Sequence, residues 1–251
     1  MDALFITKLL ESVRAEKLSI EEALVQLKKL PFEDLGYAQL DHHRSLRHGF
    51  PEVVWTEGKE LPQIVGILNR LSDGESTVMA TRVNFPLAEQ LLKNFPSGKY
   101  LESARLFILE KTKPVFKTKG PLLILSAGTS DMPVAEEAYW TAHTMGNEVQ
   151  KAYDVGVAGI HRLLAKTQMI QNAAVIIVVA GMEGALPSVV AGIAGKPVIG
   201  VPTSVGYGMS LKGLTPLFAM LTSCASGVTV VNIDNGFGAA YSATLMNRLE
   251  S

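Results

Sequence analysis

The polar residues that could do chemistry follow apolar runs typical of buried strands. The run Leu122–Leu125 ends in the turn Ser126–Asp131, and the run Ala174–Val179 leads into Gly181–Ser188. Backbone N–H groups and hydroxyls at a helix start form an anion site, and they equally suit a plain capped helix. Glu183 lies between glycines directly after a strand, where partial desolvation makes a carboxylate a usable proton acceptor. A solvent-facing Glu in a first helical turn gives the same pattern.

Two more loops rich in glycine and hydroxyls follow strand-like runs. Residues Pro202–Gly208 come after the run Pro197–Val201 and suit a phosphate or ribose contact, or an ordinary connection. The turn Asp234–Gly236 opens a helix after the run Val228–Ile233. His161, next to Arg162, follows a glycine-rich turn and is the one histidine of five that we take as a site candidate.

Cys224 is the only cysteine in the chain, so an intramolecular disulfide is excluded. It lies between an apolar helix and the last strand. Its small polar neighbours suit a thiol exposed to a ligand, although buried packing is the common role of a lone cysteine. Arg44 and Arg47, three residues apart, could clamp a phosphate or carboxylate, or lie on a solvated helix face.

The strand-like runs predict the element that positions these residues. Four continuous apolar runs and a weaker one at Glu148–Tyr153 alternate with helical stretches, which indicates a parallel sheet buried on both faces. We predict a doubly wound sheet for residues 121–251, in the flavodoxin-like order 2-1-3-4-5. Ligands bind such sheets at the carboxyl ends of the strands, where the candidate residues fall.

The first 115 residues predict a smaller α+β domain. Helical periodicity starts near Phe5 and again near Ile20, where Ser19 and Glu22 form a capping-box pattern. Strands are expected near 52–56, 77–82 and 106–110, with helices over about 60–71 and 86–93. The charged, proline-containing stretch Lys111–Pro121 is the expected boundary between domains.

Composition narrows the class of protein. With 47% hydrophobic and 19% charged residues, the chain can bury a substantial core. Its net charge of −1 gives no overall positive field that would attract nucleic acid or an acidic membrane. Its apolar runs are too short to span a bilayer, and its start lacks the pattern of a signal peptide. We therefore expect a cytoplasmic protein with small-molecule substrates. No histidine spacing indicates a metal site.

Residues 121–250 resemble the purine-biosynthetic carboxylases of the PurE class. The first strand of that family ends in Gly-Ser-x-Ser-Asp, and here Gly128-Thr129-Ser130-Asp131 follows the first strand. The third-strand loop of that family reads Ala-Gly-Gly-Ala-Ala-His-Leu-Pro. This chain has Ala185 at the histidine and Glu183 at an alanine, which implies a substrate other than aminoimidazole ribonucleotide.

Nearly the whole chain resembles LarB proteins. The segments that carry this resemblance, in order and spacing, are Asp41–Val53, Ser126–Glu136, Gly181–Pro187, Val201–Gly208 and Ser223–Tyr241. The resemblance implies a pyridinium-3,5-biscarboxylic acid mononucleotide synthase of nickel-pincer cofactor biosynthesis. Such an enzyme carboxylates C5 of nicotinic acid adenine dinucleotide with CO2 and hydrolyses the phosphoanhydride to release AMP. Likeness to PurE proteins implies a homo-octamer.

This chemistry suits the residues. A pyridinium C5 is electron-poor, but addition of the Cys224 thiolate to the ring gives a dienamine whose C5 attacks CO2. Glu183 is our candidate for removing the C5 proton. No tightly bound cofactor is expected, and Mg²⁺ could accompany the substrate pyrophosphate. The expected substrate-binding residues are Gly128, Thr129, Ser130, Asp131, His161, Arg162, Gly181, Met182, Thr203, Ser204, Gly206, Tyr207, Gly208, Asp234, Asn235 and Gly236.

Two alternatives remain open at this point. One is an aminoimidazole ribonucleotide carboxylase or mutase, which the carboxyl-terminal half favours and which Ala185 and the extra amino-terminal domain oppose. The other is a non-catalytic nucleotide-binding module, because doubly wound sheets host many functions.

Overall fold

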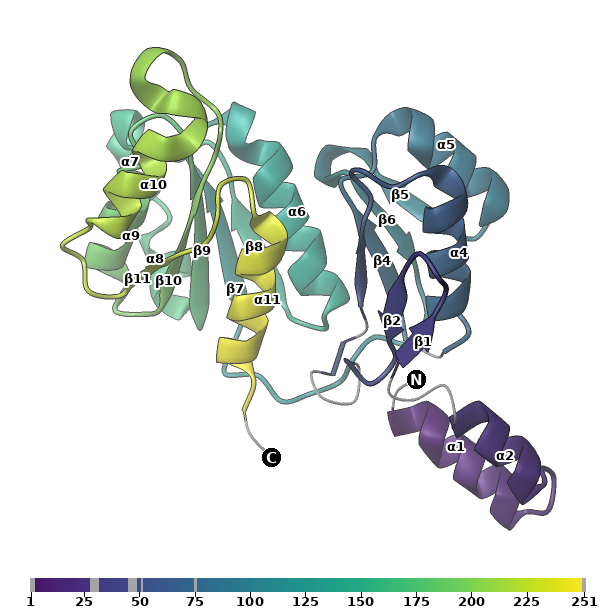
Figure 1. The fold of residues 1–251 in the computed structure, drawn as a ribbon. Helices are drawn as coiled ribbons and strands as arrows, with labels where there is room; N and C mark the ends of the chain where they lie inside the picture. Colours follow the sequence, from purple (N-terminus) through teal and green to yellow (C-terminus); the bar gives the residue numbers. More distant parts are fainter. Residues whose placement is uncertain (1–2, 28–31, 45–48, 51, 75, 250–251) are drawn as a thin grey trace. The chain divides into compact units, whose positions relative to one another are not determined.

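The structure, a computed structural model, describes residues 3–27, 32–44, 49–50, 52–74 and 76–249. It divides into two compact units, Met1–Pro114 (unit 1) and Val115–Ser251 (unit 2) (Figure 1). Within the described residues, no helix is long and apolar enough to cross a membrane.

Unit 2 is built on a five-stranded parallel sheet in the order β11-β10-β9-β7-β8. In chain order this is 2-1-3-4-5, so the predicted topology is confirmed. Ser126 pairs with Val179 and Pro202 pairs with Ala180, so the carboxyl ends of the central strands align along one edge. The strands are β7 (Leu122–Ser126), β8 (Val149–Ala152), β9 (Val175–Ala180), β10 (Val198–Pro202) and β11 (Val228–Val230).

Helices cover both faces of this sheet, because successive strand residues point to opposite sides. Leu122 and Ile124 pack toward α6 (Met132–Thr144) and α11 (Gly236–Asn247). Leu123 and Leu125 belong to the core on the other face. The helices on that face are α7 (Ile160–Leu164), α8 (Thr167–Asn172), α9 (Leu186–Ala194) and α10 (Leu214–Leu221), and 3₁₀ turns occur at η2 (Thr129–Asp131), η3 (Val157–Gly159) and η4 (Gly208–Gly213).

Unit 1 contains a mixed sheet in the order β3-β4-β6-β5, in which only β3 and β4 are parallel to each other. Helices α4 and α5 pack on it through Ile64, Leu68 and Leu91. Its strands are β3 (Val53–Trp55), β4 (Val78–Thr81), β5 (Lys99–Leu101) and β6 (Leu106–Leu109), with α4 (Leu61–Leu71), α5 (Phe85–Asn94) and the 3₁₀ turn η1 (Glu102–Ala104) between them.

The start of the chain forms α1 (Ala3–Arg14), α2 (Ile20–Leu27) and a hairpin of β1 (Phe32–Asp34) with β2 (Gln39–Asp41). The capping box that opens α2 is confirmed, because Ser19 and Glu22 each accept a hydrogen bond from the other's backbone N–H. The hairpin and β5 were not predicted, since strands of three residues are too short to show alternation.

Candidate active site

A crevice of about 560 Å³ opens at the carboxyl edge of the parallel sheet. The loops after β7, β8, β9 and β10 all contribute to it, as the sheet topology requires. Its lining residues are Ala127, Gly128, Thr129, Ser130, Asp131, Asp154, Gly156, Val157, Ala158, Arg162, Ala180, Gly181, Met182, Glu183, Ala185, Leu186, Val205, Gly206 and Tyr207.

Asp131 is a buried carboxyl group in the wall of this crevice, with only 4% of the residue exposed. It accepts hydrogen bonds from the Gly128 N–H at 2.9 Å and from the Thr203 hydroxyl at 2.7 Å. Burial raises the pKa of Asp131, and the hydrogen bond from Thr203 opposes part of that shift. Asp131 therefore keeps its proton to a higher pH than an exposed aspartate does.

Glycines let the loops around the crevice approach closely. A Cβ on Gly181 would lie 2.3 Å from the Val205 carbonyl oxygen and 2.6 Å from the Thr203 hydroxyl. A Cβ on Gly156 would lie 2.8 Å from the Ala127 carbonyl oxygen. Both contacts are shorter than a carbon side chain tolerates, so the shape of the crevice depends on glycine at these positions.

Two residues of the crevice have left-handed backbone conformations that non-glycine residues rarely adopt. Asp154, after β8, has φ 57°, and Met182, after β9, has φ 53°. Each such residue costs about 1–3 kcal/mol, and residues of this kind gather at binding and active sites. The Asp154 carboxylate pairs with Arg162 on α7, which places a guanidinium group on the crevice wall.

Glu183 lines the crevice, as expected, but its environment differs from our expectation. We expected a partly desolvated carboxylate, whereas the structure leaves Glu183 exposed in the turn between β9 and α9. That turn is short and follows the last residue of β9, so it projects beyond the edge of the sheet. The desolvated carboxylate of the crevice is Asp131 instead.

The crevice brings together more than half of the expected binding residues. Of that set, Gly128, Thr129, Ser130, Asp131, Arg162, Gly181, Met182, Gly206 and Tyr207 line it. Tyr207 is 81% exposed, so its ring is available to a ligand. His161, Thr203, Ser204, Gly208, Asp234, Asn235 and Gly236 are not in the lining.

Several of these other residues hold the surrounding structure in place. Asp234 accepts a hydrogen bond from the Ser204 N–H, joining the loops after β10 and β11. Asn235 caps α11 by accepting from the Gly238 N–H. Gly236 is buried against α6, where a Cβ would lie 2.3 Å from the Val134 carbonyl oxygen. His161 is exposed on α7.

Cys224 does not line the crevice of its own chain, contrary to our expectation. It is exposed in the loop from α10 to β11. Residues before a parallel strand lie at its amino end, and the Gly227 carbonyl accepts from the N–H of Val198, the first residue of β10. The loop still approaches α9, because Ser223 Oγ lies 2.7 Å from Ser188 Oγ.

Asp154 and the small residues Gly156, Val157 and Ala158 also line the crevice, although they were not predicted to bind substrate. They follow β8, so the same rule that found the other loops applies to them. Their signal was weak because β8 is an edge strand with polar residues. Among the described residues, no three His, Cys, Asp or Glu side chains converge as metal ligands. Of the pair Arg44 and Arg47, Arg47 lies outside the described residues.

Comparison with known proteins shows the family of the chain. Residues 122–251 match the AIR carboxylase family model, and residues 32–111 match the LarB/PurE-like N-terminal domain. An uncharacterized protein of Methanocaldococcus jannaschii is 43% identical over 241 residues, covering 92% of this chain and 93% of that protein. Unit 2 is thus an AIR carboxylase-type α/β domain. With its N-terminal domain, the chain belongs to the LarB family.

Relatives of unit 2 alone are also found. An N5-carboxyaminoimidazole ribonucleotide mutase of M. jannaschii is 34% identical over 127 residues, covering 49% of this chain and 75% of that protein. A probable mutase of the same kind from Methanothermobacter thermautotrophicus is 33% identical, over 50% of this chain and 37% of that protein. The match to a crystal structure of a Treponema denticola PurE2 variant covers 49% of this chain and 77% of the PurE2 chain. The sequence identity is 23% and the TM-score is 0.41.

Proposed function

We propose that this protein carboxylates C5 of the pyridinium ring of nicotinic acid adenine dinucleotide and hydrolyses its phosphoanhydride, releasing AMP and pyridinium-3,5-biscarboxylic acid mononucleotide. The observation that carries this proposal is the crevice itself. A turn with hydroxyls and backbone N–H groups, a guanidinium group and the carboxyl groups of Asp131, Asp154 and Glu183 converge there, in a chain of the LarB family.

The binding roles follow from what each lining residue offers. Thr129 and Ser130, in the turn that opens α6, present hydroxyls and backbone N–H groups to a phosphate. Arg162, held by Asp154, supplies the planar fork that pairs with an oxyanion. The exposed Tyr207 ring offers an aromatic face to a ring of the dinucleotide. Mg²⁺ would come with the substrate pyrophosphate.

The reaction places two separate demands on the protein. A thiolate adds to the pyridinium ring, forming a C–S bond, and C5 of the resulting dienamine attacks CO2. A base then takes the C5 proton, and the C–S bond breaks to restore the aromatic ring and the thiolate. Glu183, exposed and ionisable at the crevice, is our candidate for that base. Asp131 accepts hydrogen bonds from the Gly128 N–H and the Thr203 hydroxyl, and its role would be to hold the loops of the crevice in place.

Cys224 does not line the crevice of its own chain, and we infer that the thiol of the covalent route comes from a second copy. We therefore propose that the active protein is a homo-oligomer in which the Cys224 loop of one copy faces the crevice of another. The octamer implied by the PurE resemblance would satisfy this requirement.

One incubation separates this proposal from its alternatives. The protein is mixed with nicotinic acid adenine dinucleotide, bicarbonate and Mg²⁺, and the products are identified by mass spectrometry. We expect a carboxylated mononucleotide and AMP, and ¹³C-bicarbonate should label the new carboxyl group. Arg162→Gln should lower both products.

The control incubation replaces the dinucleotide with aminoimidazole ribonucleotide or its N5-carboxy form. Turnover of these alone would show the purine-pathway reaction named for the relatives of unit 2. Dinucleotide binding with no labelled product would indicate a nucleotide-binding module. Either result would overturn the proposal.

A further inference from the structure

Glu136 is a buried carboxylate of unit 2 that does not line the crevice. It lies on α6, and only 6% of the residue is exposed. Its Oε1 accepts hydrogen bonds from the Tyr153 hydroxyl at 2.8 Å and from Lys151 Nζ at 2.6 Å, and its Oε2 accepts from Trp140 Nε1 at 3.0 Å. A buried carboxylate is costly unless it is paired and hydrogen-bonded, and here both oxygens have donors. Glu136 therefore ties α6 to the chain at the end of β8.

Tyr153 follows the last residue of β8, and its ring packs against the core on the α6 face of the sheet. Ala152, one residue earlier, belongs to the core on the opposite face. Burial, and then the hydrogen bond to Glu136, raise the pKa of Tyr153 well above its ordinary value, so the phenol keeps its proton and remains a donor. The chain is thus held from both faces of the sheet immediately before Asp154.

Asp154 is the residue of the crevice whose left-handed backbone needs this support, with φ 57°. A strained conformation of this kind persists only where the surrounding structure holds it. The Asp154 N–H makes a long contact, 3.4 Å to the Ser126 hydroxyl. On the far side, Val155 is buried and its N–H donates to the Ser126 carbonyl at 3.0 Å. On the near side, the anchor is the side-chain hydrogen bond from Tyr153 to Glu136.

We propose that Tyr153 and Glu136 are positioning residues of the crevice. Their hydrogen bond holds the backbone at Asp154, and Asp154 in turn fixes the Arg162 guanidinium where it can pair with a ligand oxyanion. The Asp154–Arg162 pair is about half-exposed, and such a pair orients its partners only weakly unless its backbone is fixed. The inference rests on the proposed function only in taking Arg162 as a contact of the phosphates of the substrate.

Tyr153→Phe removes the hydrogen bond and keeps the ring. Calorimetric titration with inorganic pyrophosphate measures binding by the crevice without any turnover. We expect Tyr153→Phe to weaken pyrophosphate binding about three- to tenfold, because the guanidinium group is no longer held in its binding orientation. Amide hydrogen exchange, followed by mass spectrometry, should also become faster in the segment 153–162, since that segment loses an anchor.

The coupling to Arg162 separates positioning from a general loss of structure. In an Arg162→Gln background, Tyr153→Phe should have no further effect on pyrophosphate affinity, because the group that it positions is absent. The faster hydrogen exchange should remain in that background. An equal loss of affinity in both backgrounds, unchanged affinity or exchange in Tyr153→Phe, or no pyrophosphate binding by the wild type would overturn the proposal.

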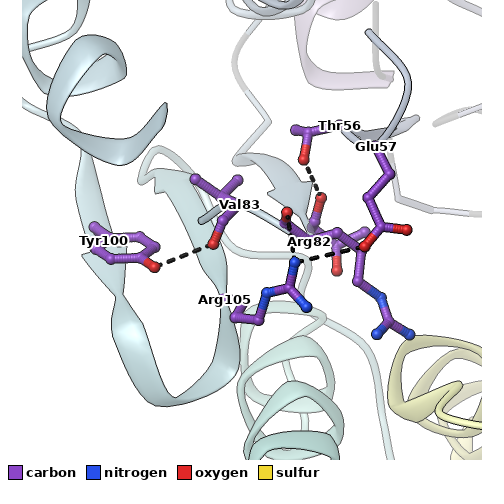
Figure 2. A network of polar contacts seen from close by, with 7 residues as sticks. Thr56, Glu57, Arg82, Val83, Tyr100 and Arg105 are labelled. Atoms are coloured by element: carbon purple, nitrogen blue, oxygen red, sulfur yellow. Dashed lines mark hydrogen bonds and ion pairs between the residues drawn. The ribbon is translucent and has the colours of Figure 1, made fainter. Parts of the chain in front are cut away.

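The matched control is Tyr100→Phe, which removes the hydroxyl of another partly buried tyrosine, in unit 1. Figure 2 shows that hydroxyl donating to the Val83 carbonyl, at 3.1 Å. This variant should change neither the pyrophosphate affinity nor the exchange of segment 153–162. The proposed function can fail separately, because an absence of carboxylation together with the expected pyrophosphate results would overturn that function and support the positioning role.

Discussion

The Thr203 hydroxyl donates a 2.7 Å hydrogen bond to the Asp131 carboxylate, joining the loop after β10 to the turn after β7. The two strands are not neighbours, since β9 lies between them. Both residues are buried, and Asp131 is part of the crevice wall. This one bond therefore ties two walls of the candidate active site together.

We expect Thr203→Val to lower the free energy of unfolding by about 1–3 kcal/mol, because one oxygen of a buried carboxyl group loses its hydrogen-bond donor. Urea unfolding measures this loss as a lower midpoint concentration. The slope of the free energy of unfolding against urea concentration should not change. Thr203→Ser keeps the hydroxyl, so its free energy of unfolding should be closer to that of the wild type. A Thr203→Val variant as stable as the wild type would show that the bond contributes little.

The raised pKa of Asp131 predicts a pH dependence of stability. The folded state binds its proton more tightly than the unfolded state, where the pKa is near 3.8. The stabilisation is therefore fully present below that pH and is lost as pH rises through the folded-state pKa. Relative to Asp131→Asn, the wild type should lose stability over this range. A difference that stays constant with pH would contradict the assigned burial.

Two glycine substitutions should have opposite effects. Gly181→Ala places a Cβ 2.3 Å from the Val205 carbonyl oxygen, so we expect a loss of about 1–3 kcal/mol and weaker substrate binding. Gly192→Ala is the matched control. Gly192 lies in α9, and an added Cβ there would have nothing within 4 Å. The substitution should therefore stabilise the protein by about 0.5–1 kcal/mol. Thermal unfolding of both variants, with binding measured by calorimetry, tests the pair.

Mixing variants tests whether Cys224 serves the crevice of another copy. Cys224→Ser should abolish carboxylation, since a serine hydroxyl is scarcely ionised near neutral pH. Glu183→Gln should stall proton removal and accumulate a ring adduct, visible by intact-protein mass spectrometry. When the two inactive variants are mixed and allowed to exchange subunits, a fraction of the activity should return. Full activity of Cys224→Ser alone would refute the covalent route.

The sequence was sufficient for the architecture of unit 2 and for about half of the residues that line its crevice. Continuous apolar runs indicate strands that are buried on both faces. A parallel sheet covered by helices on both sides buries strands in this way. The residues that follow those strands then had to meet at one edge, which is why Gly128, Arg162 and Glu183 were found in advance.

Only the tertiary structure decided which side chains are buried and which loops reach the crevice. Asp131 and Glu183 are both carboxylates after strands, but their different burial depends on how far each loop projects and on Thr203, far away in the chain. Cys224 is equally suitable by residue type, but only the fold shows that it does not line the crevice of its own chain. Burial and proximity arise from contacts between distant segments, and local sequence patterns do not contain that information.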